Sequence, residues 1–212
     1  MNEFIAGAAS GLAQNIVGHP FDTAKVYIQN NRPLTTLKPI QLYRGFIYPT
    51  IFSIGSTGLI FSLNNILNNE IDNNFASGFI SGLTIAPICY GFDLLKIKKQ
   101  IPGKFPSKLY GFGSTIARES IAFSFYFGTY FKMTEEYKYE PFYSGGLAGL
   151  LAWTFSYPID VIKNRQMANN MTLKKALNMG KFWKGYGLCA TRAVVVNSVG
   201  FKTYDLTLKN IF

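Results

Sequence analysis

Three charged residues stand inside largely apolar stretches of the sequence and are the first candidates for chemistry. Arg118 and Glu119 are adjacent, and Arg192 is followed by the run AVVV. An arginine can bind a carboxylate through two parallel hydrogen bonds, while a glutamate can hold an ammonium group. We therefore expect these three side chains to bind a small zwitterionic or anionic solute. The alternative is that each pairs with a neighbour for structural reasons alone.

A second candidate group is an aspartate followed three positions later by a lysine, a pattern that occurs three times. Residues three apart are neighbours on a helix surface, and three helix ends that meet on an axis can pair each aspartate with a lysine of another copy. We expect a ring of ion pairs here, because three separate surface pairs would each contribute little. The six residues are Asp22, Lys25, Asp93, Lys96, Asp160 and Lys163.

The spacing around these motifs shows a threefold internal repeat. A glycine lies 13 residues before the start of each motif, and a later glycine lies 16 residues before a phenylalanine in each copy. We predict a single domain over 1–212, with repeats at about 1–69, 70–138 and 139–212. The landmarks are Gly7, Gly78 and Gly145 for the first set, and Gly45 with Phe61, Gly111 with Phe127 and Gly185 with Phe201 for the second.

Each repeat is expected to hold two membrane helices. Residues 46–67 and 141–159 contain no charged residue and are long enough to span a bilayer. The other segments carry isolated charges, which favours helices that line a polar cavity. Glycine pairs at 7/11, 78/82 and 145/149 predict close backbone packing of helices. The fold class is an all-α membrane protein with six transmembrane helices in three tandem helix pairs, related by threefold pseudosymmetry.

Composition narrows the function classes further. Of 212 residues, 48% are apolar and only 15% are charged, yet the net charge is +10. This combination favours a membrane protein, and nucleic-acid binding through basic loops would not explain the repeats. The single histidine, His19, and the distant cysteines Cys89 and Cys189 form no metal-binding or nucleophile–base pattern. We expect no enzyme activity, metal or cofactor, and reduced cysteines.

The repeated Pro-x-Asp-x-x-Lys, followed by an aromatic-basic-Gly before the next helix, resembles the signature of the mitochondrial carrier family (solute carrier family 25). The resemblance covers essentially the whole chain and implies that the six charges form a matrix gate. It implies glutamine braces at Gln29 and Gln100, while Met167 departs from the pattern. It also implies cardiolipin contacts, at Arg44, Gly45, Gly111, Lys184 and Gly185.

The resemblance further implies substrate contact points at one depth in the membrane. They lie seven residues after the glycine that precedes the second helix of each repeat. These are Phe52, Arg118 and Arg192, with Ser53 and Glu119 beside them. A charge at that depth costs about 2.5–3.5 kcal/mol on insertion scales, so an unused arginine is not expected. The Arg-Glu pair resembles the amino-acid and carnitine branch. The phenylalanine could instead stack on a nucleotide base or pack on a cation, which keeps a nucleotide carrier open.

The end opposite the gate departs from the family pattern. A second ring of charges would need three acids and three bases, and only Asp205 of the six positions is charged. A conventional second salt-bridge ring therefore cannot form, so a non-transporting adaptor with the carrier fold is an alternative function. Closure there would rely on packing or on polar contacts of asparagines. The other five positions are Asn65, Asn68, Phe131, Thr134 and Leu208.

Loop charge orients the predicted protein in its membrane. The loops at 25–44, 96–111 and 163–184 hold 15 of the 21 lysines and arginines, whereas the opposite loops are acidic. The positive-inside rule then places the basic loops in the matrix or cytoplasm and both termini on the other side. We predict a monomeric, multi-pass carrier of the mitochondrial inner membrane that exchanges a small metabolite by alternating access, with its matrix gate closed at rest.

Overall fold

The computed structural model describes residues 2–71, 73–101, 103, 105 and 108–211. The described side chains exclude those of 2–8, 36, 54–58, 61, 141–142, 194, 197–198, 200–201, 204–205, 208 and 210–211. Within this part the secondary structure is helical, with six long α-helices. They are α1 (Asn2–Gln29), α2 (Ile47–Ile71), α3 (Asn74–Gln100), α4 (Phe112–Phe131), α5 (Pro141–Asn169) and α7 (Tyr186–Ile211).

Short helical turns occupy the connections at one end of the long helices. They are η1 (Leu34–Thr36) and η2 (Pro39–Tyr43) between α1 and α2, and α6 (Leu173–Asn178) between α5 and α7. At the other end, η3 (Lys132–Glu136) follows α4.

The second helix of each predicted repeat (α2, α4 and α7, which we call the even helices) starts in the same way, after a glycine in register. Gly45, Gly111 and Gly185 have φ values of +79°, +86° and +87°, and each precedes or caps the first turn of α2, α4 or α7. Residues with a Cβ rarely adopt this left-handed conformation, whereas glycine does so readily. The same backbone turn therefore recurs once in each predicted repeat.

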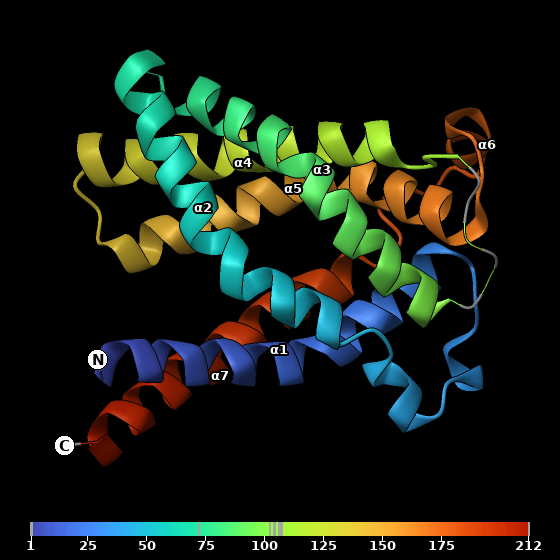
Figure 1. The fold of residues 1–212 in the computed structure, drawn as a ribbon, viewed down its shortest axis with the longest axis horizontal. Coiled ribbons are helices and arrows are strands. Elements are labelled where there is room, and N and C mark those ends of the chain that lie inside the picture. The colour runs from blue at the N-terminus through green and yellow to red at the C-terminus, as the bar shows by residue number, and fades with distance from the viewer. Residues whose placement is uncertain (1, 72, 102, 104, 106–107, 212) are drawn as a thin grey trace.

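The helices form a bundle whose two ends carry different connections (Figure 1). α3, α4 and α5 lie side by side, α1 packs along α7, and α2 runs across to α3. Both termini lie at one end, together with the α2–α3 and α4–α5 connections, which we call the terminal end. The basic connections 30–46, 101–111 and 170–185 meet at the other end, which we call the loop end.

The predicted glycine packing holds in one repeat and is wrong in the others that can be judged. A Cβ added at Gly78 or Gly82 of α3 would lie 2.5 Å from a backbone oxygen of α4, so this helix pair packs backbone to backbone. Gly11 of α1 and Gly145 and Gly149 of α5 have no such neighbour within 4 Å among the residues that the structure describes. The reason is that α3 packs directly on its own partner α4, whereas α1 and α5 pack mainly on helices of other repeats. The side chain position of Gly7 lies outside the described residues.

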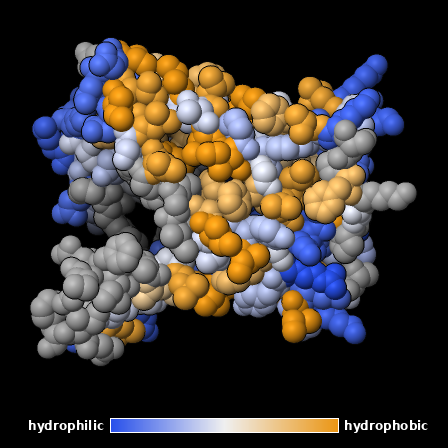
Figure 2. All heavy atoms as spheres, viewed as in Figure 1, coloured by the Kyte–Doolittle hydropathy of each residue, from blue (hydrophilic) through white to orange (hydrophobic). Residues whose placement is uncertain are grey.

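The outer surface carries a broad apolar band. Among the described residues, one helix, α3, is long enough and apolar enough in mean hydropathy to cross a membrane by length and composition. Figure 2 nevertheless shows hydrophobic side chains across the middle of the molecule and hydrophilic ones gathered at its ends. Exposed apolar residues on α2 and α3 include Ile51, Leu59, Ile66, Phe79, Leu83 and Ile88.

Candidate functional site

At the loop end, a cyclic set of ion pairs joins the first helices of the three repeats, α1, α3 and α5, which we call the odd helices. Each aspartate binds the lysine of another repeat, so that the first repeat pairs with the second, the second with the third and the third with the first. Lys96 Nζ lies 2.8 Å from Asp22 Oδ2, Lys163 Nζ 2.7 Å from Asp93 Oδ2, and Lys25 Nζ 2.8 Å from Asp160 Oδ2. The structure brings together all six residues proposed from the sequence.

The three pairs are not equally enclosed. The side chain of Asp160 is 5% exposed and accepts further hydrogen bonds from Gln29 Nε2 and Asn164 Nδ2, both at 3.1 Å. The side chain of Asp93 is 32% exposed and binds Lys163. Of the two predicted braces, Gln29 contacts a gate charge, while Gln100 Nε2 donates to Thr23 Oγ1 at 3.0 Å.

A second cyclic set of contacts lies two residues further along each odd helix. These side chains donate to backbone carbonyls at the end of the next odd helix around the ring. Tyr27 Oη donates to Gln100 O at 3.1 Å, Lys98 Nζ to Ala168 O at 3.4 Å, and Arg165 Nε to Gln29 O at 2.9 Å. The last carbonyls of a helix lack partners within the helix, so these contacts satisfy them from a neighbouring repeat. We call this set the carbonyl ring.

Arg165 is the most enclosed member of the carbonyl ring. Its side chain is fully buried, and its guanidinium also donates to Gly180 O at 2.6 Å and more weakly to Ala176 O and Lys181 O at 3.4 Å. These carbonyls belong to α6 and the loop that follows it. Arg165 therefore joins α5, the end of α1 and the third loop.

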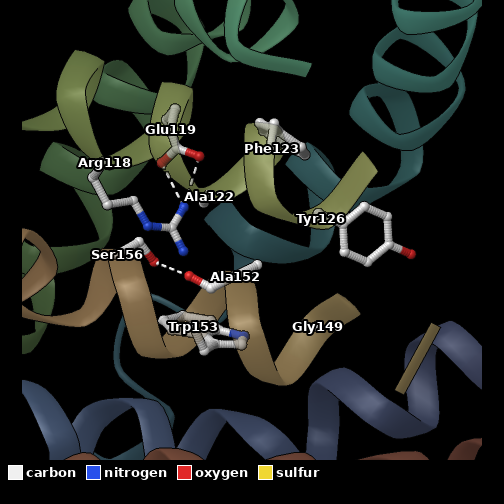
Figure 3. A pocket seen from close by; sticks show the side chains of 9 residues that line it. All are labelled: Arg118, Glu119, Ala122, Phe123, Tyr126, Gly149, Ala152, Trp153 and Ser156. Carbon is white, nitrogen blue, oxygen red and sulfur yellow. Dashed lines mark hydrogen bonds and ion pairs between the residues drawn. The ribbon is translucent and has the colours of Figure 1, made fainter. Parts of the chain in front are cut away.

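Above the ring of ion pairs lie three cavities that share lining residues, with volumes of about 170, 180 and 130 Å3. Arg118 borders all three, and Glu119 borders the first two. Figure 3 shows Arg118 and Glu119 from α4 facing Trp153 from α5 across the first cavity. The positions near the middle of α4 thus place both predicted charges at a hollow rather than on the outer surface.

Arg118 and Glu119 form an ion pair with each other. Arg118 Nη1 lies 2.6 Å from both carboxylate oxygens of Glu119. Arg118 Nε is buried and has no hydrogen-bond partner among the described residues. The guanidinium also lies 4.9 Å from the centre of the Trp153 ring. The pair is thus structural in part, and it leaves one buried donor of Arg118 without an acceptor among the described residues.

Arg192 reaches the gate from α7. Its Nε lies 2.7 Å from Asp22 Oδ1, so Asp22 is shared between Arg192 and Lys96. Gly18 of α1 makes room for this contact, because a Cβ there would lie 3.1 Å from Arg192 Nη2. A predicted substrate contact and a predicted gate residue therefore form an ion pair.

The first contact point is aromatic. Phe52 of α2 lines the second cavity, and its ring centre lies 5.3 Å from that of Phe92 on α3. Ser53 is exposed and its hydroxyl accepts a hydrogen bond from Asn15 Nδ2 at 3.2 Å. Phe52 therefore faces the same hollow as Arg118, while Ser53 bridges α1 and α2.

Sequence reasoning missed Trp153 and the carbonyl ring. The Trp153 ring lies between two cations, with Lys25 Nζ at 4.5 Å on the gate side and Arg118 on the cavity side. The carbonyl ring has a sequence signal, since Tyr27, Lys98 and Arg165 each stand two residues after a gate lysine. All three are long hydrogen-bond donors, but they share no residue type, so the pattern is visible only once the repeat register is drawn.

The predicted lipid contacts lie at the loop end. Arg44 is exposed, whereas Lys184 Nζ is engaged with Asn31 Oδ1. Beside Gly111 is a groove of about 580 Å3. Its apolar lining, which could accept an acyl chain, includes Leu109, Ile159, Ile162, Leu173 and Leu177.

At the terminal end, the asparagines proposed for closure differ in their surroundings. Asn65 is exposed, and its neighbour Asn64 is buried and accepts a hydrogen bond from Ser77 Oγ at 3.1 Å. Asn68 accepts from the same hydroxyl at 3.4 Å. Thr134 donates to Tyr130 O within its own helix region. Of the remaining positions, Phe131 packs on an apolar cluster, and the side chains of Asp205 and Leu208 lie outside the described residues.

Comparisons with known proteins agree with this geometry. Residues 134–212 match the family model described as mitochondrial carrier protein. The chain is 27% identical to the mitochondrial basic amino acids transporter of Rattus norvegicus, over 99% of this chain and 89% of that protein. It is 25% identical to the mitochondrial arginine transporter BAC2 of Arabidopsis thaliana, over 99% of this chain and 91% of the relative.

A third relative carries a different substrate name. The mitochondrial glycine transporter YMC1 of Saccharomyces cerevisiae is 24% identical, over 99% of this chain and 91% of that protein. All three relatives match along nearly their whole length, and the family match covers the third of the predicted repeats. With the motif register and the cyclic ion pairs already described, the chain is thus similar to mitochondrial carriers over almost its whole length.

Proposed function

We propose that this chain carries a small amino-acid-like metabolite, zwitterionic or anionic, across the mitochondrial inner membrane by alternating access. The observation that carries the proposal is the position of the cyclic ion pairs directly beneath the cavities. Arg118 and Arg192 border the hollow, and the ring of ion pairs closes it toward the loop end. A solute bound there would be separated from the loop side by residues that it could displace.

The bond between Arg192 and Asp22 supplies a way to couple binding to gating. Asp22 is bound by Arg192 at 2.7 Å and by Lys96 at 2.8 Å. A substrate carboxylate that takes Arg192 removes one of the two cations that hold Asp22. The remaining pair with Lys96 is then easier to break, and the loop end can open. Substrate binding energy would in this way be used to shift the equilibrium between the two states.

The architecture that accompanies this function is six transmembrane helices in three tandem pairs related by threefold pseudosymmetry. Two sets of contacts that run around the odd helices, the ion pairs and the carbonyl ring, support it, and so does the glycine turn that recurs before each even helix. The protein would act as a monomer, with the basic loop end in the matrix. Anionic lipid such as cardiolipin would bind at the starts of the even helices, beside Gly45, Gly111 and Gly185.

Uptake into liposomes by the purified protein tests the transport function. Liposomes that contain cardiolipin would be loaded with an amino-acid mixture and offered labelled amino acids outside. We expect saturable uptake that Arg192→Ala reduces to background, because the substrate then loses its bidentate partner. The matched control is Lys202→Ala, which removes an exposed cation from the same helix. Unchanged uptake by Arg192→Ala, with the fold intact in detergent, would show that the substrate binds elsewhere.

A non-transporting adaptor with the carrier fold is the second candidate. The terminal end favours it, since the described residues there form asparagine–serine contacts where a charged ring would be needed for a conventional gate. An adaptor would show no uptake of any solute and no effect of Arg192→Ala. Measured transport of any one metabolite excludes it.

A further inference from the structure

The second cavity is an aromatic chamber. It holds about 180 Å3 and is walled by three phenylalanines, Phe52, Phe92 and Phe123, from three different helices. Pro49 and Cys89 complete the apolar wall. An engineered apolar cavity of about 150 Å3 in another protein binds benzene, so a phenyl-sized group fits this chamber. We call it the phenylalanine chamber.

Charged residues border the phenylalanine chamber and the two adjoining cavities, and they do not balance. Among the described lining residues, the bases outnumber the acids by five to four. Asp205, whose side chain is not described, stands 13 residues after Arg192, or about 20 Å along a helix, and is too distant to supply the missing charge. The bases are Lys25, Lys96, Lys163, Arg118 and Arg192, and the acids are Asp22, Asp93, Asp160 and Glu119.

Every described acid at the site is already bound by a cation. Asp22 binds two, and Glu119 places both oxygens against one nitrogen of Arg118. No described carboxylate is therefore left for a second ammonium or guanidinium group of a substrate. The buried Nε of Arg118, in contrast, has no acceptor among the described residues. A substrate that brings one negative charge fits this arrangement, and one that brings a net positive charge opposes it.

We propose, on the basis of the proposed function, that the substrate carries one carboxylate on an aromatic or branched apolar body and has no second cationic group. Its carboxylate lies between Arg118 and Arg192, and its apolar body fills the phenylalanine chamber. Aromatic and branched 2-oxo acids, and the neutral amino acids with the same side chains, belong to this class. The relatives named for basic amino acids and arginine carry substrates with an extra positive charge, so the selectivity of this chain differs from what those names describe.

A comparison of four labelled solutes tests the selectivity. Liposomes that contain the wild-type protein would take up phenylpyruvate, phenylalanine, leucine and arginine at equal concentration and pH 7. We expect phenylpyruvate, phenylalanine and leucine each to be taken up at least tenfold faster than arginine. Arginine uptake equal to or faster than these three overturns the inference and leaves the proposed transport function standing. Absence of uptake for all four overturns both.

A charge added to the chamber sharpens the test. Phe52→Glu places a free carboxylate beside the apolar wall, and we expect it to shift the ratio of arginine to phenylalanine uptake upward by at least tenfold. Phe52→Gln is the matched control, because its side chain has the same shape as that of Phe52→Glu and no charge; it loses the ring alone, so we expect it to shift that ratio several-fold less than Phe52→Glu does. An equal shift in both variants would mean that loss of the ring, not charge, sets selectivity, and would overturn the role assigned to the net charge. Folding of each variant is checked by its thermal transition in detergent, and the wild-type comparison decides the proposal if Phe52→Glu does not fold.

Discussion

The loop end and the terminal end of the bundle are joined by different kinds of contact. At the loop end, the three odd helices exchange ion pairs and side-chain-to-carbonyl bonds between repeats. At the terminal end, the described contacts are the close packing of α3 on α4 and the polar contact of Ser77 with two asparagines. The first set relates all three repeats, whereas the second lies in the second repeat and its junction with the first.

The difference indicates which end holds the resting state. Closing the loop end forms three partly buried ion pairs and the carbonyl ring, although desolvation of the charges cancels part of the gain. Closing the terminal end forms few polar contacts among the described residues. A difference of about 1.4 kcal/mol between the two gates would bias the populations tenfold. The structure has the ring of ion pairs formed, as this comparison requires.

Replacement of Arg165 should cause the largest loss at the loop end. Arg165→Ala removes a fully buried guanidinium and leaves up to four backbone carbonyls without their partner, at Gln29, Ala176, Gly180 and Lys181. We expect a loss of about 3 kcal/mol or more, because buried acceptors that lose a charged donor are costly. Thermal unfolding in detergent measures it, with exposed Lys174→Ala as the control cation. Equal transitions for the two variants would show that the carbonyl ring does not hold the loop end together.

Close packing at the terminal end can be broken without any change of charge. Gly78→Ala puts a methyl group 2.5 Å from Phe123 O, so α3 and α4 must separate. We expect a loss of about 2 kcal/mol, within the range for overpacked sites. Gly145→Ala is the matched control, since it stands at the same register in the third repeat and has open space around it. If Gly145→Ala were as damaging as Gly78→Ala, the sequence expectation of equivalent glycine packing would be restored.

The sequence could predict the ring of ion pairs because identical residue types recur at a fixed offset. It could not predict that Arg192 would bind Asp22, since that contact depends on how α7 crosses α1 at Gly18. Glycine pairs were visible, but which helix each would face was not. At the terminal end, the buried asparagine is Asn64, one position before the proposed Asn65. A shift of one residue turns a side chain by about 100° around the helix axis, so it faces different neighbours.

The enclosure of the three gate acids predicts unequal effects on opening. Asp160→Asn weakens a 5% exposed carboxylate that is held by Lys25, Gln29 and Asn164. Asp93→Asn weakens a 32% exposed one that is held by Lys163. We expect Asp160→Asn to shift the population toward the loop-open state about tenfold, or about 1.4 kcal/mol, and Asp93→Asn to shift it less.

Labelling from either side of the membrane measures that shift. A single cysteine would be placed by Ala122→Cys, on the wall of the first cavity, after replacement of Cys89 and Cys189 by serine. An impermeant maleimide should react mainly from the terminal side in the otherwise wild-type protein, and increasingly from the loop side in Asp160→Asn. Preferential labelling from the loop side without substrate would reverse the comparison of the two ends.

The smallest expected effect separates two asparagines at the terminal end. Ser77 Oγ has one proton and lies within reach of Asn64 Oδ1 at 3.1 Å, Asn68 Oδ1 at 3.4 Å and Asn74 O at 3.2 Å, so it can satisfy only one acceptor at a time. Asn64 is 1% exposed, so its replacement removes a fully buried polar side chain, whereas Asn68 is only partly buried. We expect Asn64→Ala to cost about 1 kcal/mol and Asn68→Ala less than about 0.5 kcal/mol, measured as shifts of the thermal transition. A larger loss for Asn68→Ala would mean that the less buried asparagine carries the contact between α2 and α3, and that the terminal end is held more strongly than its described contacts indicate.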